Sequence, residues 1–206
     1  IMPSLVGSEM CIRDRKGRHN TVNALAALAL GSAIKLQNMI MLQTLRVFKG
    51  LPHRCESVAT IDNVLYIDDS KGTNVGATLA AIEGFGSESK KNILLIAGGQ
   101  GKGQSFDDLR DAAGRFLKCS VLYGEDAHQI EKALHSVVSI HRAKSLDSAV
   151  VLAKQTAVPG DIVLLSPACA SFDLFSGFEE RGQCFQHAVL SNNEKLLDAS
   201  KRGASC

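Results

Sequence analysis

Tryptophan is absent from this 206-residue chain, and aromatic residues together make up only 5% of it. Aromatic rings are the platforms on which single-stranded nucleic acids stack, so their scarcity argues against a base-stacking surface. The charge also argues against nucleic-acid binding, because the formal net charge is only +2 at pH 7 and no block of like charges occurs. We therefore expect no nucleic-acid partner.

Long hydrophobic runs are also missing, since no apolar stretch reaches the ~18 residues that a membrane span requires. The first residues, IMPSLVGSEMCIRDR, lack the apolar core of a secretory signal. Cysteine occurs at positions 11, 55, 119, 169, 184 and 206, but no pair has the C-x-x-C spacing and none clusters with histidine as zinc ligands do. We expect reduced thiols, a cytoplasmic location and no membrane partner.

The chain does contain a regular alternation of segments that resemble strands and helices. The continuous apolar segments NILLIA (92–97) and DIVLL (161–165) predict strands covered on both faces. Helices of ~10–13 residues between such strands predict parallel βαβ units. SVATIDNVLYIDDS predicts a hairpin that turns at Asp62 and Asn63. The expected fold is α/β, with an open, doubly wound, mostly parallel, Rossmann-like sheet of about six strands.

The N-terminal part of the chain has a different character. Residues 1–16 show no clear period, and we interpret them as a non-native segment. HNTVNALAALALGSA and LQNMIMLQTLRVFKG predict two helices, the first with Asn20 or Thr21 as its N-cap. We therefore divide the chain into the segments 1–16, 17–50 (helices), 51–192 (the α/β domain) and 193–206 (a tail).

Three polar or glycine-rich loops follow predicted strands, and ligands bind beyond the carboxyl ends of strands in such sheets. In IDDSKGTN (67–74), the carboxylates suit a ribose hydroxyl or, through water, Mg²⁺, and Lys71 suits an anion. In AGGQGKGQS (97–105), glycines let the backbone approach a ligand, and Lys102 suits a carboxylate. The alternatives are a capped turn with solvated charges and a flexible turn with an exposed lysine.

The third loop, SPACASFD (166–173), raises the question of a nucleophile. Cys169 would need a nearby base and a lowered pKa, but the local sequence offers no histidine, and His187 falls in a predicted helix. We interpret Cys169 as a structural thiol and predict that Ser171 and neighbouring amides hold a carboxylate. The second loop is not a P-loop, because Ile96 and Gly103 stand where that motif has glycine and Ser or Thr.

Six segments together resemble the Mur ligases, in the order GRHNTVNALAALALG, GLPHRCE, IDDSKGTNVGAT, GGQGKG, PGDIVLLSPACASFD and FEERGQCF. The resemblance covers about residues 17–190 and is greatest to the branch that adds D-glutamate to UDP-N-acetylmuramoyl-L-alanine. It implies an amide-bond-forming ligase of peptidoglycan synthesis that uses ATP and Mg²⁺ and works through an acyl phosphate. It also implies that the N-terminal and P-loop domains are missing, that 17–50 ends the central ATP-binding domain, and that this chain alone is inactive.

The resemblance also implies roles for individual residues, by matched motif position. The residues expected to hold D-glutamate are Thr73, Lys102, Ser171, Phe172 and Phe178. The residues expected to face ATP are Asn23, Arg54, Asp69 and Lys71. Lys102 and His19 are the expected catalytic residues, and His19 is also the one candidate metal ligand, since its motif lines the magnesium side of the nucleotide site.

Two alternatives stay open at this point. The first is a Mur ligase that adds another amino acid, although the DNPR sequence typical of the meso-diaminopimelate-adding member is missing. The second is a stand-alone Rossmann-like module that binds a small acid or a nucleotide. In each case we expect a monomer that acts on small molecules.

Overall fold

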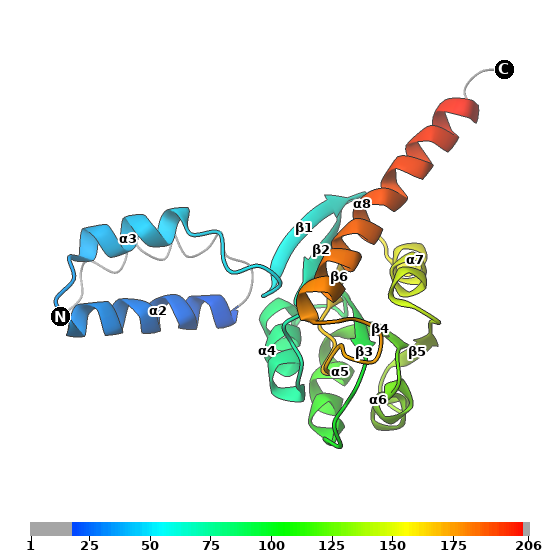
Figure 1. Cartoon of the computed structure of the whole chain (residues 1–206), viewed down its shortest axis with the longest axis horizontal. Helices are drawn as coiled ribbons and strands as arrows, with labels where there is room; N and C mark the ends of the chain where they lie inside the picture. Colours follow the sequence, from blue (N-terminus) through cyan, green and yellow to red (C-terminus); the bar gives the residue numbers. More distant parts are fainter. Residues whose placement is uncertain (1–17, 204–206) are drawn as a thin grey trace.

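A computed structural model describes residues 18–203 of the chain, with side chains for residues 21–191. The segment 1–16, which we interpreted as non-native, lies outside the described residues. A helical pair stands at one side, and an α/β domain follows it (Figure 1).

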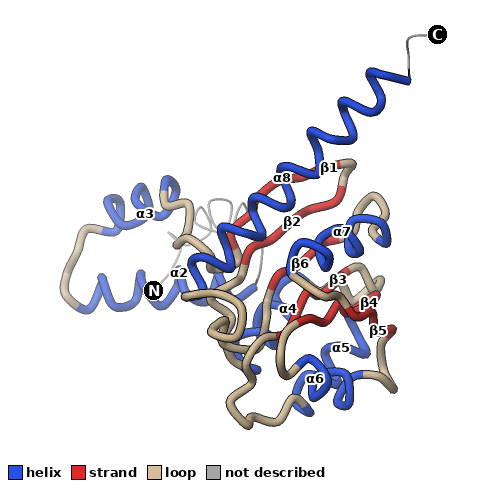
Figure 2. Tube along the Cα trace, turned by 45° about the vertical axis from the view of Figure 1, so that its right-hand side comes forward, coloured by secondary structure: helices blue, strands red, loops and turns tan. Residues whose placement is uncertain are grey.

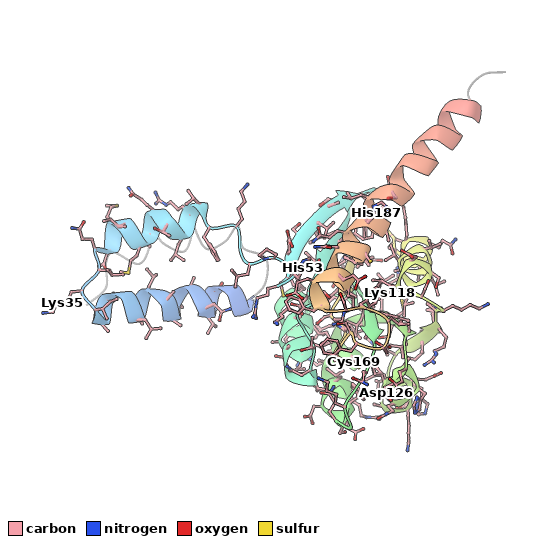
Figure 3. All side chains as sticks on the ribbon, viewed as in Figure 1. Lys35, His53, Lys118, Asp126, Cys169 and His187 are labelled. Atoms are coloured by element: carbon pink, nitrogen blue, oxygen red, sulfur yellow. The ribbon has the colours of Figure 1, made fainter. Side chains whose placement is uncertain are left out.

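The helical pair consists of α2 (Arg18–Ala33) and α3 (Asn38–Val47), which confirms the prediction of two helices before the sheet. Lys35, in the turn between them, lies at the end of the pair farthest from the sheet (Figure 3). The predicted N-cap is wrong: α2 already includes Arg18, so Asn20 and Thr21 lie inside it. Alanine and leucine favour the helix strongly enough for it to continue through both polar residues.

The sheet has six strands, the number that the sequence predicts, and the structure places them in the order β1-β2-β6-β3-β4-β5. All neighbouring pairs are parallel except β1 with β2. The turn between these two strands falls at Asp62 and Asn63, whose φ angles are 50° and 60°, as a two-residue hairpin requires. The strands are β1 (Glu56–Ile61), β2 (Val64–Asp68), β3 (Ile93–Gly98), β4 (Leu117–Tyr123), β5 (Ser139–Arg142) and β6 (Ile162–Leu165).

Helices cover both faces of the sheet (Figure 2). One face carries α4 (Val75–Phe85), the short helix η1 (Asp107–Leu109) with α5 (Arg110–Phe116), and α6 (Ala127–Leu134). The other face carries α7 (Leu146–Thr156) and α8 (Phe178–Gly203). The last helix continues through the range that we assigned to a tail, 193–206, as far as Gly203. None of the helices among residues 18–203 is both long and apolar enough to cross a membrane.

Alternate side chains of the central strands pack into two separate hydrophobic cores, one on each face of the sheet. On β3, Leu95 and Ala97 pack with α4, α5 and α6, whereas Leu94 and Ile96 pack with α7 and α8. Every residue of β3 is buried, which explains why the strand is a continuous apolar run rather than an alternating one. Burial of each leucine or isoleucine side chain of β3 contributes about 1.5–3 kcal/mol, so this strand is a stable support for the loop that follows it.

Candidate functional site

Three loops meet at the carboxyl edge of the sheet because their strands are neighbours in the order β2-β6-β3. We call them the β2 loop (69–74), the β3 loop (99–106) and the β6 loop (166–177). Gln100 and Ala170 exchange two backbone hydrogen bonds of 2.9 Å, and the Ala168 amide donates to the Gly72 carbonyl at 2.9 Å. These contacts bring the three loops together at one edge of the sheet.

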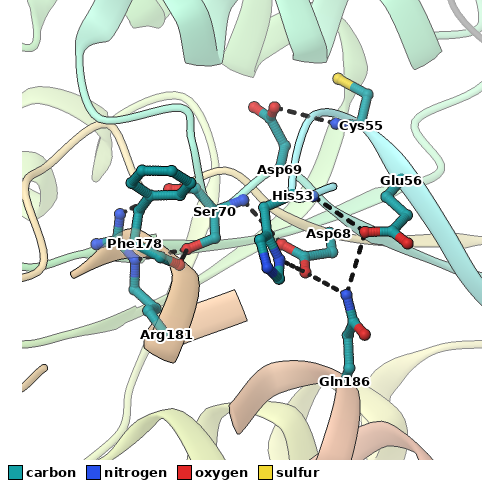
Figure 4. Close-up of polar contacts among 9 residues, drawn as sticks. All are labelled: His53, Cys55, Glu56, Asp68, Asp69, Ser70, Phe178, Arg181 and Gln186. Atoms are coloured by element: carbon teal, nitrogen blue, oxygen red, sulfur yellow. Dashed lines mark hydrogen bonds and ion pairs between the residues drawn. The ribbon is translucent and has the colours of Figure 1, made fainter. Parts of the chain in front are cut away.

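Asp69 in the β2 loop is a buried carboxyl with only 7% of its surface exposed. Its Oδ2 accepts a hydrogen bond from the Ser166 hydroxyl at 2.7 Å. Its Oδ1 accepts one from the Cys55 amide at 3.2 Å (Figure 4). Burial raises the pKa of Asp69 to about 6, and the nearby Asp68 adds to this, whereas the two hydrogen bonds oppose it. Asp69 therefore ties the β2 loop to the β6 loop.

Lys71 lies over an aromatic ring contributed by α8. Its ammonium is 3.7 Å from the centroid of the Phe178 ring, well within the range of a cation–π contact. The His53 ring meets the same phenyl ring edge-on, with 6.2 Å between centroids. The Lys71 amide donates to the His53 carbonyl at 3.0 Å. The segment before β1, the β2 loop and the start of α8 thus form one side of the site.

Lys102 occupies the tip of a tight turn in the β3 loop. Its φ is 54° and that of Gly103 is 75°, and the Gln104 amide donates to the Gly101 carbonyl at 3.2 Å. The Lys102 side chain is exposed, and its ammonium is 5.6 Å from the centroid of the Phe172 ring on the β6 loop. Phe172 is itself 63% exposed, so a cation and an apolar face both point to solvent here.

Cys169 lies inside the α/β domain and is fully buried (Figure 3). Burial raises the pKa of its thiol to about 12, although the nearby Arg181 acts in the opposite direction. A neutral, inaccessible thiol is a poor nucleophile, which supports its interpretation as a structural residue. Ser171 is also buried, and its carbonyl accepts the amides of Leu174 and Phe175, so the β6 loop turns sharply after it.

Arg181 on α8 is a functional candidate that the sequence did not reveal. Its guanidinium is fully buried, and it donates to the Ser70 hydroxyl at 3.0 Å, the Ser70 carbonyl at 2.9 Å and the Cys169 carbonyl at 3.1 Å. Ser70 in turn donates to the Phe178 carbonyl at 2.8 Å (Figure 4). Arg181 therefore joins α8 to the β2 and β6 loops. The segment FEERGQCF contains it, but nothing in that pattern says which loops the arginine contacts.

A second set that sequence reasoning missed joins α8 to β1 and β2. Asp68 Oδ2 lies 2.7 Å from His53 Nδ1, and Gln186 donates to Asp68 at 2.8 Å and to Glu56 at 3.2 Å (Figure 4). One donor atom from each of His53, Glu56 and Asp68 lies within 4.8 Å of the others, which is close enough to consider a metal. Asp68 Oδ2 is paired with His53 Nδ1, and Glu56 Oε2 accepts from the His53 amide at 3.0 Å and from Gln186, so we interpret the set as a hydrogen-bonded brace.

Comparison with known proteins decides the family. Residues 53–169 match the profile described as "Mur ligase, glutamate ligase domain". The chain belongs to the Mur ligase family. This confirms the resemblance drawn from the six sequence segments.

Curated relatives carry a more specific name. The UDP-N-acetylmuramoylalanine--D-glutamate ligase of Acinetobacter baylyi is 55% identical over 177 residues, which cover 84% of this chain and 40% of the relative. The enzyme of the same name from Legionella pneumophila (strain Lens) is 52% identical over 174 residues, with 84% and 39% covered. This Mur ligase chain therefore spans about two fifths of the length of the curated relatives that it matches.

Solved structures share the Mur ligase fold at low sequence identity. UDP-N-acetylmuramate-alanine ligase of Thermotoga maritima superposes with a TM-score of 0.61 at 18% identity, over 85% of this chain and 39% of that chain. Folylpolyglutamate synthase of Mycobacterium tuberculosis, complexed with ADP and AMPPCP, gives a TM-score of 0.62 at 15% identity, over 82% and 40%. At these identities the likeness establishes the fold alone.

Seven of the ten residues implied by the Mur ligase resemblance lie together in the structure, and the other three, Arg54, Asn23 and His19, lie outside the three loops. Those on the three joined loops and at the start of α8 lie in one region: Thr73, Lys102, Ser171, Phe172 and Phe178, together with Asp69 and Lys71. Arg54 is exposed between His53 and Cys55, which both have positive φ angles. Asn23 is exposed on α2, and the side chain of His19 lies outside the described residues.

Proposed function

We propose that this chain is the C-terminal part of an ATP-dependent ligase that adds D-glutamate to UDP-N-acetylmuramoyl-L-alanine. The names of the relatives at 50–55% identity support the substrate. The observation that carries the proposal is Lys102, an exposed ammonium on a tight turn that faces the exposed ring of Phe172. Lys102 forms none of the ion pairs found among residues 21–191, so its charge is available for a substrate carboxylate.

The proposed reaction has two steps. The terminal phosphoryl group of ATP passes to the carboxylate of UDP-N-acetylmuramoyl-L-alanine, which gives an acyl phosphate and ADP. The amine of D-glutamate then attacks the acyl carbon, and phosphate leaves as the amide forms. In this scheme the chain's own role in the second step is to hold the incoming amino acid, and the residues assigned to it are Thr73, Lys102, Ser171, Phe172 and Phe178.

The residues assigned to the nucleotide are Asn23, Arg54, Asp69 and Lys71, and Lys71 borders the amino-acid residues because it lies over the Phe178 ring. Lys71 and Arg54 supply positive charge suited to phosphates. Asp69 is less open than the sequence suggested, because both of its oxygens accept hydrogen bonds within the protein. A ribose contact would therefore require Asp69 to share its lone pairs with the ligand.

Mg²⁺ is the metal that the proposed chemistry needs, since it neutralises charge on the phosphates. Mg²⁺ prefers oxygen ligands in an open octahedral arrangement. Among residues 21–191 the one set of donors close enough for a metal is His53, Glu56 and Asp68, and it is closed by internal hydrogen bonds. These residues fit Mg²⁺ poorly, and we derive no step from it. His19 stays the candidate ligand in this chain, and we place the reaction in the cytoplasm, where ATP is available.

A chimaera tests the proposal. Residues 17–206 of this chain replace the corresponding segment of the Acinetobacter baylyi relative, and phosphate release is measured with D-glutamate, ATP and UDP-N-acetylmuramoyl-L-alanine varied separately. We expect activity that depends on all three substrates. The 206-residue chain alone should release no ADP, because its sequence contains no P-loop motif and the phosphates lack their main cradle. ADP release by this chain alone, or a folded chimaera that ignores D-glutamate, would contradict the proposal.

Lys102→Ala tests whether this lysine binds D-glutamate or the nucleotide. A charge-assisted hydrogen bond is worth about 1.5–3 kcal/mol, so the KM for D-glutamate should rise about ten- to hundredfold, with a smaller change for ATP. Lys102→Arg should restore only part of this, because the guanidinium is larger and planar. Lys132→Ala, an exposed lysine on α6, is the matched control and should change neither constant. A rise in the KM for ATP alone would make Lys102 a nucleotide residue.

A further inference from the structure

The side chain of Gln104 connects all three loops of the site. It belongs to the β3 loop, and its Nε2 donates to the Ala168 carbonyl on the β6 loop at 2.6 Å. Its Oε1 accepts the Val75 amide, where the β2 loop enters α4, at 3.2 Å. Val75 is the first residue of α4, so this amide is one of those that a helix leaves without an internal acceptor. One uncharged amide group thus satisfies a donor and an acceptor on two other loops.

Hydrogen bonds anchor both ends of the Lys102 turn to the rest of the protein. At its start, the Gly101 amide donates to Asp126 Oδ2 at 2.7 Å. At its end stands Gln104, with the two side-chain hydrogen bonds described above. Between them, Lys102 has a φ of 54°, in the left-handed region that non-glycine residues avoid. A backbone in that region persists only where its surroundings hold it.

Ala168, the hydrogen-bond partner of Gln104, also has a positive φ that its surroundings must hold. Its φ is 59°, its amide donates to the Gly72 carbonyl, and its carbonyl accepts from Gln104. The position of the β6 loop before Ser171 therefore depends on contacts from both other loops. Loss of the Gln104 side chain would remove one anchor of Ala168 and one anchor of the Lys102 turn at the same time.

We propose that Gln104 is a positioning residue that sets the place of the Lys102 ammonium relative to the β6 loop and the start of α4. This rests on the proposed function, in which Lys102 binds a carboxylate of the incoming amino acid. Gln104 acts through Lys102 and need not touch the substrate. Its removal should weaken the use of the amino acid more than the use of the nucleotide.

Hydrogen exchange on the 206-residue chain tests the anchoring independently of any activity. Gln104→Met keeps the length of the side chain without its hydrogen bonds, so the Val75 amide should exchange about tenfold faster. Gln104→Glu keeps the acceptor for Val75 but loses the donor to Ala168, so Val75 should stay better protected than in Gln104→Met. The control is Gln155→Met, at an exposed glutamine on α7. Unchanged exchange at Val75 in Gln104→Met would overturn the anchoring role.

A double-mutant cycle in the chimaera tests the functional part. Gln104→Met alone should raise the KM for D-glutamate about five- to tenfold, with the KM for ATP nearly unchanged and the melting temperature lowered by only a few degrees. Added to Lys102→Ala, it should cause no further rise, because residues that act through one another are not additive. Additive effects, or an unchanged KM for D-glutamate, would overturn the proposal. If the unmutated chimaera does not ligate D-glutamate, the proposed function itself fails, while hydrogen exchange still decides whether Gln104 anchors the loops.

Discussion

Asp69→Asn should stabilise this chain at neutral pH, although it alters a residue of the candidate site. The carboxyl is buried, and its pKa lies near 6 in the folded chain, against an ordinary value of 3.8. Its proton is therefore bound more tightly by the folded than by the unfolded chain. As far as this group is concerned, the free energy of unfolding is highest below pH 3.8, falls as the pH rises to 6, and is flat above that.

The size of the effect follows from these two pKa values. At 1.36 kcal/mol per pKa unit, keeping the Asp69 carboxylate ionised costs about 3 kcal/mol above pH 6. An asparagine is neutral at every pH and avoids this cost. Its hydrogen bonds also fit: Oδ1 can accept from the Cys55 amide, and Nδ2 can donate to the Ser166 hydroxyl, which then donates to Thr78 at 3.0 Å. The variant should therefore gain up to about 3 kcal/mol at pH 7.5.

Unfolding measurements at several pH values provide the assay. For a chain of this length the gain corresponds to a rise in Tm of about 6–12 °C at pH 7.5, which should shrink to about half near pH 5 and vanish below pH 4. The difference between variant and unmutated chain cancels the titration of groups that both share. An equal difference at pH 5 and pH 7.5 would show that Asp69 does not titrate in this range. A less stable variant at pH 7.5 would show that the protein favours the ionised form, and the reasoning would be refuted.

Two further predictions concern the same edge of the sheet. Cys169, whose thiol is buried with a pKa near 12, should stay unmodified by iodoacetamide at pH 8 while the half-buried Cys184 reacts; mass spectrometry decides, and equal labelling of both would contradict the burial of Cys169. Gly98→Ala should lower the free energy of unfolding by about 3 kcal/mol, because its φ is 132° and an added Cβ would overlap the Tyr123 carbonyl. Gly103→Ala, whose φ is 75° and whose Cβ would meet open space, should cost only about 1 kcal/mol, so equal losses in urea unfolding would refute the steric argument.

Local patterns were sufficient for the elements of this fold. The hairpin at Asp62 and Asn63 follows from residues that tolerate a positive φ, and Asn74 and Ser145 cap α4 and α7 through their own side chains. The apolar run of β3 predicted burial on both faces, which the two cores confirm. The start of α2 was predicted wrongly, because a cap is a weak signal beside a run of residues that all favour helix.

The sequence by itself thus determined the strands, the helices, the family motifs and the fact that three polar loops end strands. Only the tertiary structure decided how those loops are joined, because β6 inserts between β2 and β3 and brings Asp69 to Ser166 and Gln104 to Ala168. Arg181 is buried against these same two loops, and burial beside them raises the pKa of Asp69. Hydrogen bonds between residues far apart in the chain depend on strand order. The hydrophobic pattern of a strand predicts that it is buried but does not predict which strands pair with it.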